Sequence, residues 1–227
     1  MKKKMRIAAF AVSFAAAAGT VCWYLHNHFL AKADPAPIRV ACVGDSITFG
    51  HGTEPRSEHN YPYLLQQHLG NKWQVKNFGV SGSIVHNIGD LPYTSTSAFL
   101  DSLEFEPDVL VLMLGTNDSK SHNWTDPEIL RQDYESMLSE YLDVNPDMQI
   151  LLCTCATVYD NPFDIRESRV TILNNLVRTI AEEHGYPLVD IHALTLDQPQ
   201  WFPDGVHPNN EGAAAIAQAV AEALKGK

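Results

Sequence analysis

Ser46 has the neighbours expected of a nucleophilic serine. It lies in the string G-D-S-I-T, from Gly44 to Thr48, directly after the β-branched apolar run 38–43, which is typical of a buried strand. A serine hydroxyl attacks a carbonyl only when a base takes its proton, another group orients that base, and donors meet the developing oxyanion. Taken alone, however, Gly-Asp-Ser is also typical of a turn that closes a strand.

Three other polar segments contain residue types that could complete such a site. They are N-F-G-V-S-G at 77–82, G-T-N-D at 115–118 and D-G-V-H-P-N at 204–209. Glycines allow close backbone approach, amides and backbone N–H groups donate hydrogen bonds, and a histidine can take a proton. The segments lie far apart in the sequence, so only the fold can bring them to Ser46.

Apolar runs alternate with amphipathic segments along the chain, which predicts strands alternating with helices. The predicted strands are 38–43, 74–78, 108–114, 148–155 and 187–191, and the predicted helices are 61–69, 94–105, 127–141, 170–180 and 212–224. Five apolar strands separated by helices predict one α/β domain, a three-layer α/β/α sandwich with a five-stranded parallel sheet covered on both faces. Ligands bind beyond the carboxyl ends of such strands, where all four polar segments are expected to meet.

These four segments, in this order, resemble the motif blocks of the SGNH hydrolase superfamily, also called the GDSL esterases and lipases. The blocks span residues 44–209, which is most of the predicted domain. The resemblance implies a flavodoxin-like SGNH hydrolase fold and a serine ester hydrolase activity.

The resemblance also assigns roles to individual residues. It implies that Ser46 is the nucleophile, His207 the general base and Asp204 the carboxylate that holds the other nitrogen of the imidazole. The oxyanion hole would consist of the backbone N–H groups of Ser46 and Gly82 and the side-chain amide of Asn117. The implied reaction passes through an acyl-enzyme and requires no cofactor and no metal. The other histidines at 51, 59, 86, 122 and 192 lack the combination of a carboxylate and the terminal-helix context that His207 has.

The segment from Gly89 to Tyr93, together with 115–120 and Asn123-Trp124, resembles the carbohydrate-acetylesterase members of the superfamily more than the lysophospholipases. We therefore expect removal of O-acetyl groups from a carbohydrate. Four aromatic residues in loops near the catalytic edge are candidates for stacking on sugar rings, or simply pack their loops: Tyr93, Trp124, Trp201 and Phe202.

Two other functions fit the same scaffold. A lysophospholipase or thioesterase would need a continuous apolar groove leading from Ser46. A non-catalytic glycan-binding module would keep the fold without turnover, and the presence of all four motif blocks argues against it.

The N-terminal segment 1–33 has the pattern of an export signal or membrane anchor. Lysines and an arginine precede the apolar stretch 7–25, and Ala31-Lys32-Ala33 matches a cleavage site. The stretch is also long enough to span a bilayer, so cleavage and retention as a membrane tether remain alternatives. Residues 34–37 are predicted to be a linker and 38–227 the hydrolase domain. These features predict a bacterial protein that is secreted or held at the outer face of the cytoplasmic membrane.

The domain itself is strongly acidic. Residues 1–33 contain five of the 16 Lys and Arg and none of the 27 Asp and Glu, which leaves a formal charge of −16 for the rest of the chain. Such a charge disfavours nucleic acids and anionic membranes as partners, because both gain affinity from cationic neutralisation. It is compatible with a neutral ester substrate such as an acetylated glycan.

The cysteines of the domain are Cys42, Cys153 and Cys155, and all three lie in apolar strand-like runs. They are expected to be buried free thiols, and no Cys/His spacing predicts a zinc site.

Overall fold

The structure is a computed structural model that describes residues 36–226. The predicted export segment, its apolar stretch 7–25 and the first half of the predicted linker, residues 34–35, lie outside the described residues. No described helix is both long enough and apolar enough to cross a membrane.

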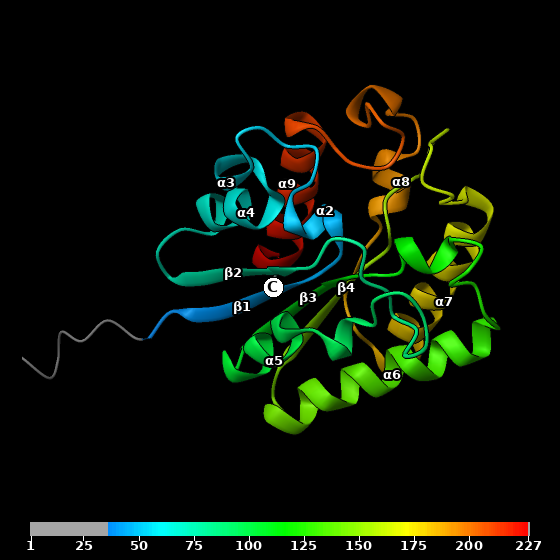
Figure 1. Ribbon diagram of the computed structural model, residues 1–227. Coiled ribbons are helices and arrows are strands. Elements are labelled where there is room, and N and C mark those ends of the chain that lie inside the picture. The colour runs from blue at the N-terminus through cyan, green and yellow to red at the C-terminus, as the bar shows by residue number, and fades with distance from the viewer. Residues whose placement is uncertain (1–35, 227) are drawn as a thin grey trace, which may run out of the picture. The chain divides into compact units, whose positions relative to one another are not determined.

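Five parallel strands form one sheet in the order β2-β1-β3-β4-β5 (Figure 1). Their bounds are β1 Ile38–Gly44, β2 Trp73–Gly79, β3 Val109–Met113, β4 Gln149–Cys153 and β5 Leu188–Val189. All five lie where the apolar runs predicted strands, and the predicted fold class is confirmed. Every residue of β3 is buried, as expected for a central strand covered on both faces.

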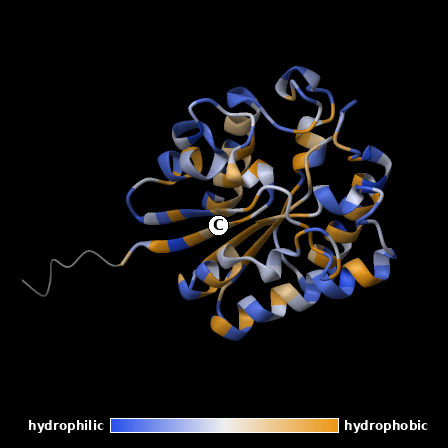
Figure 2. Ribbon diagram, in the orientation of Figure 1, coloured by the Kyte–Doolittle hydropathy of each residue, from blue (hydrophilic) through white to orange (hydrophobic). Residues whose placement is uncertain are grey.

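The larger helices cover the two faces of this sheet (Figure 1). They are α4 Tyr61–Leu69, α5 Ser97–Glu104, α6 Pro127–Val144, α7 Glu167–His184 and α9 Asn210–Lys225. Successive side chains of a strand point to opposite faces, so Val40 of β1 packs with α4 and α9 while Ala41 packs with α5, α6 and α7. Figure 2 shows the apolar strands between helices whose outer faces are hydrophilic. The domain therefore has two apolar layers, one on each side of the sheet.

Local signals define the ends of these helices. Asn60 Oδ1 accepts the N–H of Tyr63 at 3.0 Å at the start of α4, and the Asp126 side chain accepts the N–H of Glu128 at 2.9 Å at the start of α6. Gly185 ends α7 in the left-handed conformation, with φ 68°. Helix α5 begins at Ser97, a little later than the sequence predicted, because Thr96 caps it.

Ser46 begins a short helix, α2 Ser46–Phe49, where the sequence predicted only a turn. The Asp45 side chain caps this helix by accepting the N–H of Ile47 at 2.9 Å, and Gly50 ends it with φ 99°. The other short helices are α3 Arg56–His59, α8 Ile191–Thr195, η2 Tyr93–Ser95, η3 Thr116–Ser119 and η4 Pro199–Trp201.

The chain runs from β1 to β2 on one side of β1 and from β3 to β4 in the opposite direction along the sheet, so the strand order reverses between β1 and β3. Ligands of open parallel sheets bind at such a switch point, beyond the carboxyl ends of the strands. Ser46, Gly82 and Asn117 follow β1, β2 and β3 respectively, and thus all belong to this edge.

Candidate active site

Ser46, His207 and Asp204 form a continuous line of hydrogen bonds. His207 Nε2 lies 3.0 Å from Ser46 Oγ, and His207 Nδ1 lies 2.7 Å from Asp204 Oδ2. Asp204 Oδ1 also accepts the backbone N–H of His207 at 2.8 Å. This arrangement can pass a proton from the serine hydroxyl to the imidazole and stabilise the imidazolium that results.

Asp204 is held in its ionised form. Partial burial favours the neutral acid, but the ring and backbone N–H groups of His207 and the backbone N–H of Val206 outweigh burial and lower the pKa of Asp204 below its ordinary value. The carboxylate is therefore suited to orienting the ring and balancing its charge.

The tight turn of the D-G-V-H segment makes this geometry possible. Gly205 has φ 84°, and a Cβ there would lie 2.1 Å from the carbonyl oxygen of Asp160. The Gly205 carbonyl in turn accepts the N–H of Tyr159 at 2.8 Å. Asn209 then caps α9 through the N–H groups of Glu211 and Gly212. The loop between β4 and α7 is thus packed directly against the catalytic turn.

The predicted oxyanion-hole residues are brought together across three strands. Val80 donates its N–H to the Gly44 carbonyl at 2.9 Å, and Asn117 Nδ2 donates to the Ser83 carbonyl at 3.1 Å. Ser83 directly follows Gly82, so the Asn117 amide lies beside the loop that carries Gly82, and its second hydrogen remains for another acceptor. Gly82 has φ 87°, a conformation that favours glycine.

Asp118 attaches the Gly82 loop to the end of β3. Its buried carboxylate accepts the N–H of Val85 at 3.0 Å and the N–H of His86 at 2.9 Å. Burial raises the pKa of Asp118 to about 7, although the same backbone hydrogen bonds oppose the rise. Asp118 therefore ties the loop that carries Gly82 to the segment that carries Asn117.

The comparisons with known proteins agree with this geometry. A family model described as the GDSL-like Lipase/Acylhydrolase family matches residues 42–215, which is well over half of the chain. The chain belongs to this family.

Two curated relatives of this chain are esterases. An acetylxylan esterase of Xylanibacter ruminicola is 38% identical over 220 residues, covering 86% of this chain and 45% of the relative. A multidomain esterase of Ruminococcus flavefaciens is 24% identical over 225 residues, covering 83% of this chain and 28% of the relative. The chain therefore spans less than half the length of either relative.

Solved structures share the fold. An acetyl xylan esterase, AlAXEase, is 25% identical with a TM-score of 0.65, covering 82% of this chain and 100% of that one. Est24, a carbohydrate acetylesterase from Sinorhizobium meliloti, is 18% identical with a TM-score of 0.67, covering 83% of this chain and 98% of that one. An inhibitor-bound aryl esterase of M. smegmatis is 20% identical with a TM-score of 0.70 and the same coverage, 83% and 98%.

Two of the four aromatic candidates are buried, so for Tyr93 and Phe202 the packing alternative holds and sugar stacking is wrong. Tyr93 is fully buried and donates its hydroxyl to the Phe78 carbonyl at 2.7 Å. Phe202 is also buried and packs against Tyr159. Their rings complete the apolar layers instead of facing solvent.

The other two aromatics are half-buried. The guanidinium of Arg169 lies 5.0 Å from the ring centre of Trp124, and Trp201 lies against Gly212 at the start of α9. Stacking of Trp124 and Trp201 on a sugar therefore stays a prediction.

Sequence reasoning missed two rings next to the imidazole of His207. The exposed ring of His51 lies 4.2 Å from that of His207, centre to centre, and the ring of Phe163 lies 5.5 Å from it. The sequence indicates His51 only as a possible base, and nothing in the local sequence of Phe163 distinguishes it from other loop residues. Their position depends on how their loops fold back.

Of the histidines at 51, 59, 86, 122 and 192, three have carboxylate partners, contrary to what their local sequence suggested. The pairs are His86 with Asp133, His122 with Asp90 and His192 with Glu167. Each partner comes from a distant segment, so no local pattern indicates it. Among the described residues, His207 alone joins a carboxylate to the hydroxyl of Ser46.

One group of described side chains has a spacing that could hold a metal ion. The ligand atoms of His51, Asp204 and His207 lie within 4.8 Å of one another. Both ring nitrogens of His207 already have partners in Asp204 and Ser46, so the geometry favours proton transfer over metal ligation.

Proposed function

We propose that this chain is a serine ester hydrolase that removes O-acetyl groups from a carbohydrate. The observation that carries the ester hydrolysis is the line of hydrogen bonds from Ser46 through His207 to Asp204. The carbohydrate part is supported by the acetylxylan esterase relative at 38% identity.

The proposed reaction has two steps, and each proton has a defined path. Ser46 Oγ attacks the ester carbonyl while His207 Nε2 takes its proton, and the oxyanion is met by the Asn117 amide and the N–H groups of Ser46 and Gly82. The tetrahedral intermediate collapses, and His207 gives the proton to the departing alcohol. Water then attacks the acetyl-enzyme with His207 as base, which releases acetate and restores Ser46.

The first experiment compares p-nitrophenyl acetate, butyrate and octanoate with acetylated xylan and an acetylated sialic acid. Wild type is expected to prefer the acetyl ester and to release acetate from a glycan, and Ser46→Ala is expected to lose turnover. A clear preference for octanoate would instead support lipid or thioester chemistry. Glycan binding without turnover of any ester would support a non-catalytic module.

We also propose that the protein is exported, on the basis of the basic and apolar residues of segment 1–33. Cleavage would release the hydrolase domain, whereas retention would tether it to the membrane. The mass of the mature protein and its distribution between culture medium and membrane fraction distinguish the two.

A further inference from the structure

The position of His207 determines where the leaving alcohol of an ester must lie. His207 Nε2 gives a proton to that alcohol, so the alcohol oxygen must come within hydrogen-bond distance of the ring. The carbonyl oxygen instead faces the donors near Asn117. Exposed groups that border His207 therefore meet the alcohol half of the substrate, not the acyl half.

Phe163 and His51 are the two aromatic side chains packed on the His207 ring among the described residues. The Phe163 ring lies roughly perpendicular to the imidazole, with an interplanar angle of 73°, and the residue is 38% exposed. His51 is also exposed and lies just beyond Gly50, which ends α2, with its N–H donated to the Ser46 carbonyl at 2.9 Å. A partly exposed Phe beside the base leaves apolar surface that water solvates poorly.

The loop that carries Phe163 is held by its own hydrogen bonds. Asn161 Oδ1 accepts the Phe163 N–H at 3.0 Å, and Asn161 Nδ2 donates to the carbonyls of Tyr159 and Ile165. Asp164 accepts the N–H of Ser121 at 2.9 Å from the neighbouring loop. The backbone on each side of Phe163 is therefore tied down.

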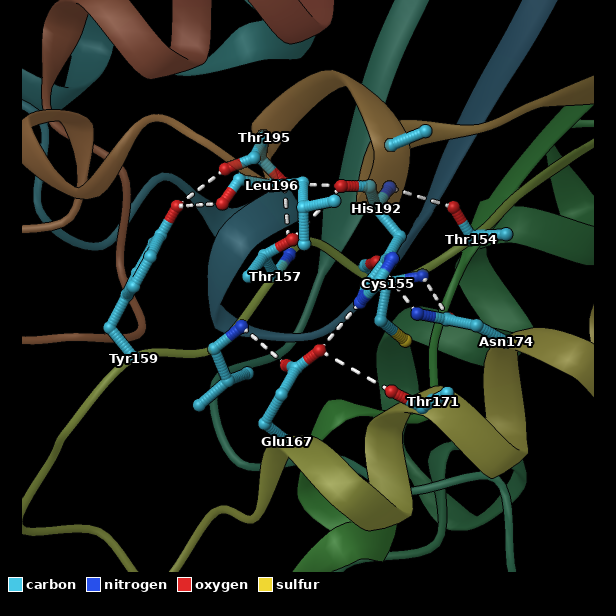
Figure 3. A network of polar contacts seen from close by, with 12 residues as sticks. Thr154, Cys155, Thr157, Tyr159, Glu167, Thr171, Asn174, His192, Thr195 and Leu196 are labelled. Carbon is cyan, nitrogen blue, oxygen red and sulfur yellow. Dashed lines mark hydrogen bonds and ion pairs between the residues drawn. The ribbon is translucent and has the colours of Figure 1, made fainter.

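A larger network anchors the base of this loop (Figure 3). Glu167 at the start of α7 accepts the Val158 N–H at 2.7 Å through one oxygen, and its other oxygen lies 2.6 Å from His192 Nε2. The Tyr159 hydroxyl donates to the Thr195 carbonyl at 2.5 Å. These contacts join the loop to α7 and α8, so the Phe163 ring is positioned before any substrate arrives. Such preorganisation lowers the entropy lost on binding.

We propose that Phe163, bordered by His51, is the surface on which the sugar ring that carries the acetyl ester binds. The inference rests on the proposed carbohydrate acetylesterase function. Aromatic rings suit the apolar faces of sugar rings. The Phe163 ring borders His207, and therefore lies on the side of the leaving alcohol. In an acetylated carbohydrate that alcohol is the sugar. Phe163 thereby selects among acetyl esters by their alcohol.

The test compares two acetyl esters with different alcohols, an acetylated xylo-oligosaccharide and ethyl acetate, using the full chain. Phe163→Ala is expected to lower kcat/KM for the oligosaccharide about tenfold, mainly through KM, because stacking and burial of one ring contribute about that factor. The loss with ethyl acetate is expected to be much smaller, and Phe163→Tyr is expected to restore the oligosaccharide rate. Tyr63→Ala, a similarly exposed aromatic at 41% on α4, is the matched control.

The outcomes separate the inference from the proposed function. Equal losses on both esters would mean that Phe163 acts only by orienting His207, and no loss on the oligosaccharide would mean that it does not bind the sugar. Either result overturns the inference. If wild type cleaves ethyl acetate but no acetylated saccharide, the carbohydrate specificity itself fails.

Discussion

His207 Nε2 lies 3.0 Å from Ser46 Oγ, although 161 positions separate the two residues in the chain. The contact joins the end of β1 to the loop before α9, which are the first and last elements of the domain. Both side chains are largely buried, so water competes little for their hydrogen bond. The catalytic geometry therefore depends on the complete fold.

Replacing Asp204 by Asn is expected to slow turnover while leaving substrate binding in place. The variant keeps the shape of the side chain but no longer holds the His207 ring in the tautomer that accepts the serine proton. We expect kcat to fall by about four orders of magnitude, as in serine hydrolases that lose this charge. Steady-state kinetics with p-nitrophenyl acetate measure the loss. A variant with near-normal kcat would show that Asp204 does not assist His207.

Replacing Asn117 by Ala removes one donor for the oxyanion. We expect kcat to fall about 10²- to 10³-fold, because the lost hydrogen bond is stronger in the transition state than in the ground state. Asn175→Ala, an exposed asparagine on α7, is the matched control and should retain wild-type kinetics. If only KM changed in the Asn117 variant, its amide would bind the ground state alone.

Gly205 and Gly185 provide a matched pair for testing the catalytic turn. Both have positive φ, 84° and 68°, but a Cβ at Gly205 would lie 2.1 Å from the Asp160 carbonyl, whereas one at Gly185 meets nothing within 4 Å. Gly185→Ala is expected to cost about 1 kcal/mol of unfolding free energy from backbone strain alone. Gly205→Ala should lower the free energy of unfolding by more than Gly185→Ala does. It should also lower kcat, because the clash displaces Asp204 and His207. Urea unfolding measures the stability of the two variants, and steady-state kinetics measure their kcat. Equal losses of stability and of kcat in both variants would contradict the special role of Gly205.

Asp118 gives stability a pH dependence with a defined sign. Burial raises its pKa in the folded chain to about 7, above the ordinary value of 3.8. The contribution of Asp118 to the free energy of unfolding is therefore fully present below pH 3.8 and is lost as the pH rises through about 7. The slope from this one group is at most about 1.4 kcal/mol of unfolding free energy per pH unit.

Replacing Asp118 by Asn removes that titration. The difference in unfolding free energy between wild type and variant, measured by urea unfolding from pH 4 to 8, is expected to shift in favour of the variant as the pH rises. A difference that stays constant over this range would show that Asp118 does not titrate there.

Much of the fold was readable from local sequence because local physics dictates it. The continuous apolar run 109–113 can only be a strand buried on both faces or a buried helix, and its five-residue length favours the strand. Asn60 and Asp126 mark helix starts because their side chains satisfy free backbone N–H groups, whatever lies beyond them. The residues Ser46, Gly82, Asn117, Asp204 and His207 were recognisable for a different reason, because their four strings, in this order, resemble the motif blocks of the family.

Side-chain exposure in the loops was decided only by the tertiary structure. Tyr93, Phe202 and Phe163 are all loop aromatics, yet two are buried and one lies beside His207. The difference arises from contacts with segments far away in the sequence, such as the Phe78 carbonyl that accepts the Tyr93 hydroxyl. The short range of sequence patterns cannot encode such contacts. By itself the sequence determined which residues could carry out ester chemistry, and the packing of distant loops decided which rings surround them.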